Sequence, residues 1–544
     1  MRRSPWSASM RAVRSGASAA RRASQSWTMG MVSTLAEPGG IASAQEREAG
    51  KQPASPSPPH PLGGPHDMQP PSPPWLLVAM LLLLCAEAGA ASTRLPRTER
   101  TRRAKASATL EQSLLAAVRD AGFDQVLDFK RDGARIAHAP YVDVAVIELD
   151  ARSRPTAAAN VLLSRDYPTG AIVPIDVETL GTTAVRYTAW NLDRWDSGAH
   201  DATPTEPLVP GRDKAPLRFM APYPASLFKL LIAFRVLRWV DQGHLTWDQP
   251  WRFLRDTEDK GTRPIRDWLE PMVTESDNTA TEALVKLLHE QGAMASLNAE
   301  LAALGLDTLQ VHGTSPVTGR SWNPGQIHMT ALDTARLLLL IEGGPGVLWR
   351  TASGRDVTAK ELSGASRTHL QSLLADQALH EALSSTLLCG DARAEPGIPA
   401  AVPTRWVNSE DGTVTAAETA FGRDTRPCNA TAEVTFLHKT GLTENYGSDG
   451  GIVRSLPGKP WRRYIVVFLS NLGYRYYDAK VADAADFAKG EDGFPYVSTS
   501  ISYTQRIPAL GRQIDAMMRE RQRARPQSPP AKDAAPQQAP RPAR

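Results

Sequence analysis

The spacing of apolar residues predicts helices through the middle of the chain. The stretch SLFKLLIAFRVLRWV, which begins at Ser226, is apolar nearly all round and ends before Gly243. This pattern is typical of a helix buried among other helices. Leucine and valine side chains within 108–118 recur on one helical face and predict an earlier helix. Further helices are expected at about 279–291, 293–304, 329–342, 366–387 and 500–522.

Alternating and β-branched stretches lie on both sides of these helices. Residues 142–149 (VDVAVIEL) predict one strand, and a strand-like stretch with intervening turns covers 171–187. Strands near the other end are predicted at 433–438, 451–454 and 463–469. Strands that surround a helical middle indicate one sheet in which early and late strands pair. The expected fold class is therefore mixed α/β (α+β), with an inserted helical subdomain.

The two ends of the chain, 1–74 and 523–544, are rich in proline and lack the apolar content of a packed core. The apolar run at 75–86 is about half as long as a membrane-spanning helix, so no stable membrane span is expected. Ala88 and Ala90 follow this run with the spacing of a signal-peptide cleavage site, which predicts export. We expect a leader, one folded domain and a disordered tail, at 1–90, 91–522 and 523–544.

The cysteines fit an exported protein. A lipid anchor at Cys85 is an alternative, but the large Leu84 before it disfavours lipidation. If Cys85 leaves with the leader, Cys389 and Cys428 remain, and an exported pair predicts a disulfide. Closing such a loop would stabilise the fold by roughly 4 kcal/mol. Two unrelated buried thiols are the alternative.

Composition excludes several classes of function. Lysine and arginine (62) exceed aspartate and glutamate (58) by only 4, and no basic stripe interleaved with aromatic residues occurs. We therefore expect no nucleic-acid partner. The 11 histidines lack zinc-ligand spacing, and the chain has no P-loop, so neither a metal nor a cofactor is expected. The oligomeric state is left open.

Ser226 and Lys229 form the only Ser-x-x-Lys in the chain, at the start of its most apolar helix. At this spacing the hydroxyl and the ammonium share a helical face. Burial among apolar residues lowers the pKa of a lysine and allows it to activate a serine nucleophile. The alternative is that Ser226 caps the helix and Lys229 reaches solvent.

Two further polar motifs follow. Ser276-Asp277-Asn278 precedes a helical run, although Thr279 and Glu282 also fit an ordinary capping box at that point. The triplet that starts at Lys439, Lys-Thr-Gly, ends the alternating strand EVTFLH, where glycine allows a ligand or another backbone to approach. Alone, such a triplet is usually an exposed strand end.

Together and in this order, the three motifs resemble the set Ser-x-x-Lys, Ser-Asp-Asn and Lys-Thr-Gly of penicillin-recognising serine enzymes. Over residues 105–522 the chain resembles class A β-lactamases and penicillin-binding D,D-peptidases. The resemblance implies an antiparallel sheet flanked by N- and C-terminal helices. It also implies a small-molecule substrate, either a β-lactam or a D-alanyl peptide.

The resemblance assigns four catalytic roles. Ser226 would attack the substrate carbonyl and form an acyl-enzyme, with Lys229 as the proton acceptor. Ser276 would pass the proton to the leaving nitrogen, and Lys439 would hold a positive field beside it.

The same resemblance implies the groups that bind the substrate. The backbone N–H groups of Ser226 and Leu442 would stabilise the oxyanion. Thr440 would bind the substrate carboxylate, beside Gly441, and the Asn278 amide would contact the substrate's side-chain carbonyl.

One expected residue is missing. Class A β-lactamases carry Glu-x-x-Leu-Asn on the omega loop, and that glutamate activates the deacylating water. Between Asp307 and Asp333 this chain has no aspartate or glutamate. Three functions stay open: β-lactam hydrolysis, a D,D-peptidase or esterase activity, and a sensor that stays acylated. The polar candidates for a substitute base are Gln310, His312, Asn323 and His328.

Overall fold

The computed structural model describes residues 95–189, 207–482 and 497–524. The predicted leader and signal peptide lie outside the described residues, as does the predicted tail from residue 525 onward. The chain divides into two units at Leu95, and all that follows concerns the unit that begins at Pro96. Within the described ranges, no helix has the length and apolar character needed to cross a membrane.

The centre of the fold is a six-stranded antiparallel sheet with the order β16-β17-β18-β3-β4-β5. The early strand β3 pairs with the late strand β18, as Val146 opposite Val466 illustrates. The prediction that strands from both ends of the chain share one sheet is therefore confirmed. The strands are β3 (Val142–Leu149), β4 (Pro155–Ser164), β5 (Tyr167–Ile172), β16 (Val434–Leu442), β17 (Gly447–Ser455) and β18 (Arg463–Ser470).

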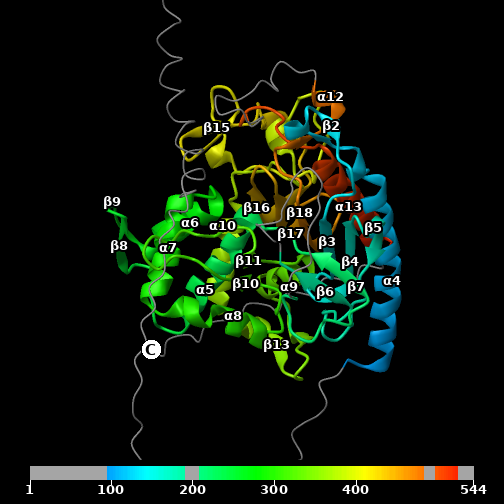
Figure 1. Ribbon diagram of the computed structural model, residues 1–544, viewed down its shortest axis with the longest axis horizontal. Coiled ribbons are helices and arrows are strands. Elements are labelled where there is room, and N and C mark those ends of the chain that lie inside the picture. Colours follow the sequence, from blue (N-terminus) through cyan, green and yellow to red (C-terminus); the bar gives the residue numbers. More distant parts are fainter. Residues whose placement is uncertain (1–94, 190–206, 483–496, 525–544) are drawn as a thin grey trace, which may run out of the picture. The chain divides into compact units, whose positions relative to one another are not determined.

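Both faces of this sheet are covered. On one face, Val144 and Val146 pack with leucines of α4 (Arg97–Asp120) and α13 (Arg506–Arg523). On the other face, Ala145 and Ile147 join the core of the helical subdomain. Alternate residues of one strand thus serve two cores, as the two-residue period of a strand requires. Figure 1 shows α4 and α13 on one side of the sheet and the green helices on the other.

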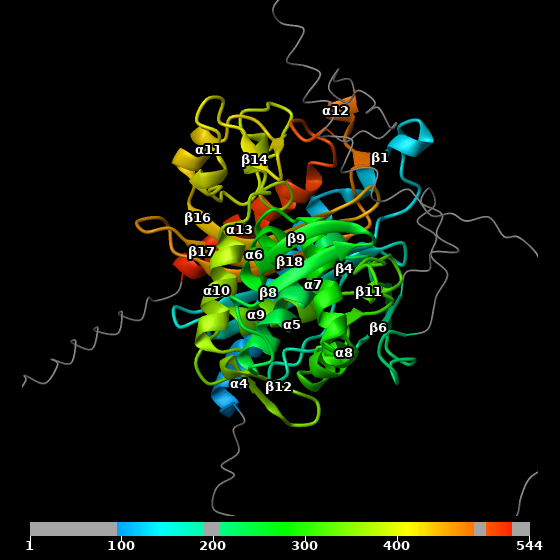
Figure 2. The same ribbon diagram turned by 90° about the vertical axis from the view of Figure 1, so that its left-hand side faces the viewer.

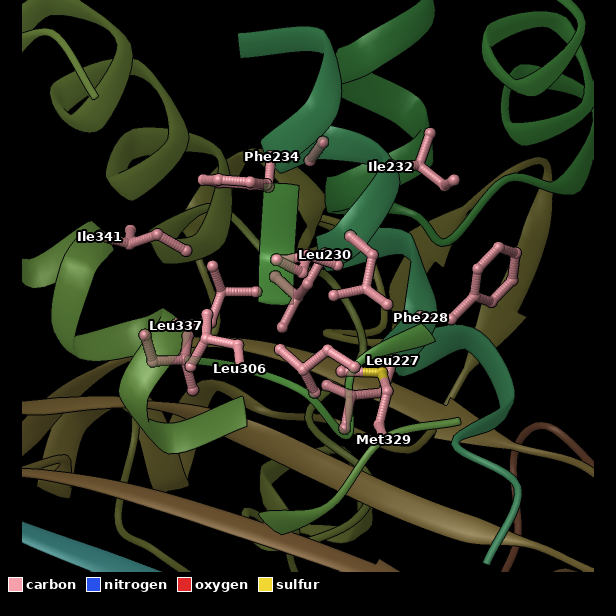
Figure 3. Packing of buried hydrophobic residues seen from close by; sticks show 14 of the residues in the cluster. Leu227, Phe228, Leu230, Ile232, Phe234, Leu306, Met329, Leu337 and Ile341 are labelled. Carbon is pink, nitrogen blue, oxygen red and sulfur yellow. The ribbon is translucent and has the colours of Figure 1, made fainter. Parts of the chain in front are cut away.

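The helical subdomain lies between β7 (Leu217–Met220) and β16 in sequence and surrounds α5, whose first nine residues are all buried. Figure 3 shows Leu227 and Leu230 meeting Met329 and Leu306, which come from distant parts of the chain. Packing on all sides explains why this segment is apolar nearly all round. The helices are η4 (Ala225–Phe228), α5 (Lys229–Asp241), α6 (Ile265–Thr274), α7 (Asn278–Glu290), α8 (Ala293–Ala303), α9 (Ala331–Glu342) and α10 (Gly364–Ala375).

Several short strand pairs are separate from the central sheet. β6 and β7 are parallel, whereas the other two-stranded pairs are antiparallel. A small three-stranded sheet has the order β19-β1-β2. These strands are β1 (Leu127–Asp128), β2 (Ala134–Arg135), β6 (Val185–Thr188), β7 (Leu217–Met220), β8 (Pro250–Arg255), β9 (Glu258–Pro264), β10 (Gln310–Val311), β11 (Ile327–His328), β12 (Val347–Arg350), β13 (Asp356–Thr358), β14 (Val414–Ala416), β15 (Thr419–Phe421) and β19 (Tyr476–Tyr477).

Three sequence expectations were incomplete or wrong. The alanine-rich β4 was not predicted, because alanine has little preference for strands and only burial between two cores favours it there. Helix α6 was not predicted, and it contains Pro271 in its interior. The predicted helix 366–387 is too long, because α10 ends at Ala375. The chain then leaves the helical path, and Gln377 donates its side-chain N–H to Val273 O of α6 (2.8 Å).

A segment between α10 and β16 forms a separate small lobe, which Figure 2 shows around β14 and α11. Cys389 and Cys428 are joined in a disulfide with a Cα–Cα distance of 6.0 Å. A core of its own, with Leu387, Val402 and Phe421 among its members, fills the lobe. We call residues 389–428 the clamped insertion. Its short helices and those nearby are η6 (Thr386–Leu388), η7 (Thr404–Trp406) and α11 (Arg426–Thr431).

Candidate active site

Ser226 lies in the 3₁₀ turn η4, directly before α5. Residues three apart in such a turn lie above one another, so Ser226 and Lys229 share a face. The backbone N–H of Lys229 donates to Ser226 O. The preceding Ala225 has a φ of 48°, a strained value for a residue with a Cβ, and such strain is common at functional sites. Ser226 is partly exposed, and among the described residues its hydroxyl has no hydrogen-bond partner.

Lys229 is only 1% exposed. Its Nζ donates to Ser276 O (2.5 Å) and to Asn278 Oδ1 (2.7 Å), and it lies 3.2 Å from Ser276 Oγ. Burial, together with the charge of Lys439, holds the pKa of Lys229 well below its usual range. A neutral amine has two N–H donors, which these two acceptors occupy. Its lone pair is then available to take a proton.

Ser276 lies between α6 and α7 with a φ of 61°, the second strained residue of the site. Its Oγ accepts a hydrogen bond from Lys439 Nζ (2.8 Å), and the same Nζ donates to Thr440 O (2.9 Å). Lys439 is fully buried, and this burial lowers its pKa to about 7. The Ser276 hydroxyl therefore stands between two amines and can pass a proton between Lys229 and a substrate.

Helix α7 does not begin with the capping box of Thr279 and Glu282 that the sequence offers as an alternative. The Asp277 carboxylate caps the helix by accepting from the N–H three residues later (2.5 Å), and the helix begins at Asn278. Thr279 and Glu282 both accept from Arg255 instead. The capping-box reading was thus wrong. With Asp277 as the cap, the first helical residue, Asn278, directs its amide oxygen to Lys229.

Gly441 brings strand β16 against the turn that carries Ser226. A Cβ at Gly441 would lie 2.5 Å from Pro224 O and 2.7 Å from Leu227 N, so no other residue fits. Because β16 is the edge strand of the sheet, its outward-facing backbone groups are not used by a neighbouring strand at this point. The segments that carry the N–H groups of Ser226 and Leu442 therefore adjoin one another.

The segment between Asp307 and Asp333 places an aromatic ring against the residues that follow Ser226. The Trp322 ring lies 5.4 Å from the Phe228 ring, and its carbonyl accepts from the Tyr223 hydroxyl (2.5 Å). An ion pair of Arg320 with the buried Glu282 (3.0 Å) fixes the same stretch to α7. Trp322 thus packs beside the turn that carries Ser226, and residues 308–332, which we call the aromatic wall, contain no aspartate or glutamate.

The polar candidates of this segment have other contacts. Gln310 donates its side-chain N–H to Asp307 O (2.8 Å), and its Oε1 lies 3.2 Å from His312 Nε2. Burial lowers the pKa of His328 to about 4, and Asn323 is exposed. Within the described residues, no group of three or more histidine, cysteine, aspartate or glutamate side chains could hold a metal ion.

Asp449, His438 and His380 form a buried cluster at strands β16 and β17. The sequence does not single out these residues. Asp449 of β17 lies directly opposite Thr440 in the sheet and is fully buried. Its Oδ1 pairs with His438 Nδ1 (2.8 Å), and its Oδ2 accepts from Leu383 N (3.0 Å). The His380 ring lies 4.5 Å from that of His438. No local sequence pattern marks this cluster, because its members meet only when the loop after α10 folds onto the sheet.

The clamped insertion also reaches the site. The Ala417 N–H, at the tip of the β14–β15 hairpin, donates to Glu275 Oε2 (2.5 Å). Glu275 directly precedes Ser276. Ala417 and Glu418 both have positive φ values, 46° and 64°, so the tip is held in a strained turn. The insertion therefore supports the loop that carries Ser276.

This geometry is that of a candidate serine-enzyme site, in which a partly exposed serine lies one turn from a buried lysine and a second serine lies between two lysines. The sequence of residues 221–485, just under half of the 544 residues, matches the model of the beta-lactamase enzyme family. The match contains all three motifs of the site. This part of the chain is therefore similar to the β-lactamase enzyme family.

Several solved structures resemble the chain. A mutant of the penicillin-binding protein PBP-A, solved as an acyl-enzyme with penicillin G, is 15% identical; the alignment covers 76% of this chain and 97% of that one, with a TM-score of 0.38. A class A β-lactamase representative from Bacteroides cellulosilyticus is 12% identical (75% and 98% covered, TM-score 0.37). A β-lactamase from Chitinophaga pinensis is 18% identical (55% and 86% covered, TM-score 0.32). No curated protein matches the sequence.

Proposed function

We propose that this protein is an exported serine hydrolase that forms an acyl-enzyme on Ser226 with β-lactams or related amides and releases it slowly. The observation that carries the proposal is the cluster of Lys229, Ser276 and Lys439. Its three side chains are buried and joined by hydrogen bonds, and Ser226, which is partly exposed, lies one turn before Lys229. Such an arrangement supplies a base, a proton path and a positive field for acylation.

Acylation would proceed in two proton transfers. The Ser226 hydroxyl attacks the substrate carbonyl and gives its proton to neutral Lys229. Lys229 then returns a proton through the Ser276 hydroxyl to the leaving nitrogen as the C–N bond breaks. The ester on Ser226 remains, and Lys229 is neutral again. The N–H groups of Ser226 and Leu442 would hold the oxyanion, a contribution of about 3–4 kcal/mol for each donor.

Slow deacylation follows from the aromatic wall. Hydrolysis of the ester needs a water molecule and a base beside it. The segment that could supply this base offers Trp322 over Phe228 and no carboxylate. Lys229 would then have to serve both steps. The acyl-enzyme would therefore persist.

Export is part of the proposal. The disulfide between Cys389 and Cys428 supports it, because such bonds persist in oxidising compartments. The expected result of N-terminal sequencing of the mature protein is a start at Ala91. A mature protein that retains residues 75–90 would remove the signal-peptide part of the proposal.

Labelling with a fluorescent penicillin tests the activity. Wild-type protein should be labelled and should keep the label through a chase with unlabelled penicillin, whereas Ser226→Ala should not be labelled. Ser321→Ala, a change at an exposed serine of the aromatic wall, is the matched control and should label like the wild type. Labelling of Ser226→Ala would exclude Ser226 as the nucleophile, and a label lost within seconds would indicate a β-lactamase.

A further inference from the structure

The backbone of Ser276 is held in a strained conformation. Its φ of 61° is unfavourable for a residue with a Cβ, and such a conformation persists only where the surrounding contacts hold it. The Ser276 hydroxyl accepts from Lys439 Nζ (2.8 Å) and lies 3.2 Å from Lys229 Nζ. Proton transfer needs groups within hydrogen-bond reach of one another. The contacts that hold the backbone at Ser276 therefore bear directly on the proton path.

The chain around Ser276 is anchored to the end of α6. Helix α6 ends at Thr274, so Glu275 is the one residue between this helix and Ser276. Pro271 O accepts from the backbone N–H groups of both Glu275 (3.1 Å) and Asp277 (3.0 Å). These backbone bonds close a tight loop with Ser276 inside it. The Glu275 side chain takes no part in them and makes a contact with a distant segment instead.

That distant segment is the clamped insertion, which contacts the end of α6 at two points. Arg405 Nη2 pairs with Glu270 Oε1 (3.0 Å) on α6 itself. The Ala417 N–H donates to Glu275 Oε2 (2.5 Å), and within the described residues it is the only hydrogen-bond donor to this carboxylate. Burial raises the pKa of Glu275, and the hydrogen bond from Ala417 opposes that rise. Of the two contacts, the one at Glu275 adjoins Ser276.

The donor of this hydrogen bond belongs to a well-anchored hairpin. Ala417 and Glu418 form its tip, and Val414 and Phe421, on its two strands, are buried in the core of the insertion. The disulfide closes the insertion at residues 389 and 428. A displacement of the hairpin would thus reach the Ser276 loop through the single hydrogen bond between Ala417 and Glu275.

We propose that Glu275 is a positioning residue for the proton path, through which the clamped insertion holds Ser276 between Lys229 and Lys439. This inference rests on the proposed acylation of Ser226. Loss of the contact would lower the fraction of molecules in which Ser276 lies within reach of both lysines. Protonation of the leaving nitrogen would slow, whereas hydrolysis of the ester has no leaving nitrogen and would not change.

The first test replaces the Glu275 side chain. Acylation by benzylpenicillin and decay of the adduct are followed by intact-protein mass spectrometry. Glu275→Ala should slow acylation on the order of tenfold, because small displacements of reacting groups have large effects on rate. Glu275→Gln keeps a carbonyl oxygen that accepts the N–H, so its rate should stay within about twofold of the wild-type rate. Neither change should alter the decay rate.

The matched control is Glu410→Ala. Glu410 is exposed on the same insertion, and within the described residues its carboxylate has no hydrogen-bond or ion-pair partner. The control makes the same charge change without touching α6, so it should acylate like the wild type. Acylation that Glu410→Ala slows as much as Glu275→Ala would overturn the inference.

The second test is a coupling cycle with the disulfide. The pair Cys389→Ser and Cys428→Ser is made in the wild-type chain and in Glu275→Ala. If the insertion acts on Ser276 through Glu275, the cysteine changes should slow acylation in the wild-type chain and add no further slowing to Glu275→Ala. Equal slowing in both backgrounds would overturn the inference, because the insertion would then act by another route.

The remaining outcomes separate the inference from the proposed function. Acylation of Glu275→Ala at the wild-type rate, or of Glu275→Gln as slowly as Glu275→Ala, overturns the inference alone. Denaturant titration shows whether each variant is folded under the assay conditions. If Glu275→Ala is not folded, the coupling cycle is made with Glu275→Ser. If benzylpenicillin does not acylate the wild type, the proposed function fails and the inference fails with it.

Discussion

The two sides of the Ser226 site differ in kind. On the acylation side, Lys229, Ser276 and Lys439 are buried and joined by hydrogen bonds of 2.5–3.2 Å. On the opposite side, Trp322 packs on Phe228 and no acidic residue occurs between Asp307 and Asp333. A buried polar network is stable only when every member is satisfied. In the proposed reaction, the ester would form beside this network, and its hydrolysis would lack a carboxylate from the Trp322 segment.

Replacing Lys229 should have the largest effect on the acylation rate. Lys229→Ala removes the proton acceptor, so acylation by benzylpenicillin should slow by a factor on the order of 10²–10⁴. Stopped-flow or mass-spectrometric rates measure this, with Lys105→Ala on the exposed face of α4 as the control. The loss of a general base usually slows a reaction far more than about threefold. A Lys229→Ala variant that acylates within about threefold of the wild-type rate would therefore show that another base acts.

The disulfide should affect the acylation side alone. Cys389→Ser together with Cys428→Ser should lower the free energy of unfolding by roughly 4 kcal/mol, measured by denaturant titration. The loosened hairpin tip should also weaken the contact of Ala417 with Glu275 beside Ser276. Acylation should slow while the decay rate of the acyl-enzyme stays constant. A change in decay without a change in acylation would contradict this division.

Removing the Trp322 ring should change the decay of the acyl-enzyme and not its formation. Trp322→Ala admits water next to Phe228, so the acyl-enzyme should decay faster by about tenfold while acylation changes little. Val317→Ala, an exposed position of the same segment (67% exposed), is the control. An unchanged decay rate in Trp322→Ala would mean that the missing base, and not the excluded water, limits hydrolysis.

The pH profile should show the smallest effect. Burial holds the pKa of Lys229 well below its usual range, so its neutral, basic form increases as pH rises and acylation should rise with it. Burial lowers the pKa of Lys439 to about 7, so its positive charge is lost above that pH. Acylation should therefore rise and then fall. A profile that rises without a decline above pH 7 would show that the Lys439 charge is not needed.

The sequence predicted the acylation side better than its surroundings. Ser226 and Lys229 lie one turn apart, so local spacing alone places them together. The resemblance of the three motifs to a known set predicts that they lie in one site. The pair of Asp449 and His438 could not be found in this way, because the two residues lie on neighbouring strands and the loop that carries Leu383 packs onto them only in the fold.

Secondary structure shows the same limit. The all-round apolar α5 and the β-branched β3 were predicted because their own residues favour those structures. Alanine-rich β4 forms a strand because it is buried between two cores. The helix predicted over 366–387 ends at Ala375, because contacts of the following residues with α6 outweigh local helical preference. In the last two cases a tertiary contact decided the outcome.

The most direct test of the central claim is a time course of the intact protein's mass after a single addition of benzylpenicillin and removal of the excess. The account predicts one covalent adduct, located on the peptide that contains Ser226, that persists for many minutes at neutral pH. Absence of an adduct, an adduct elsewhere, or its loss within seconds would contradict the account.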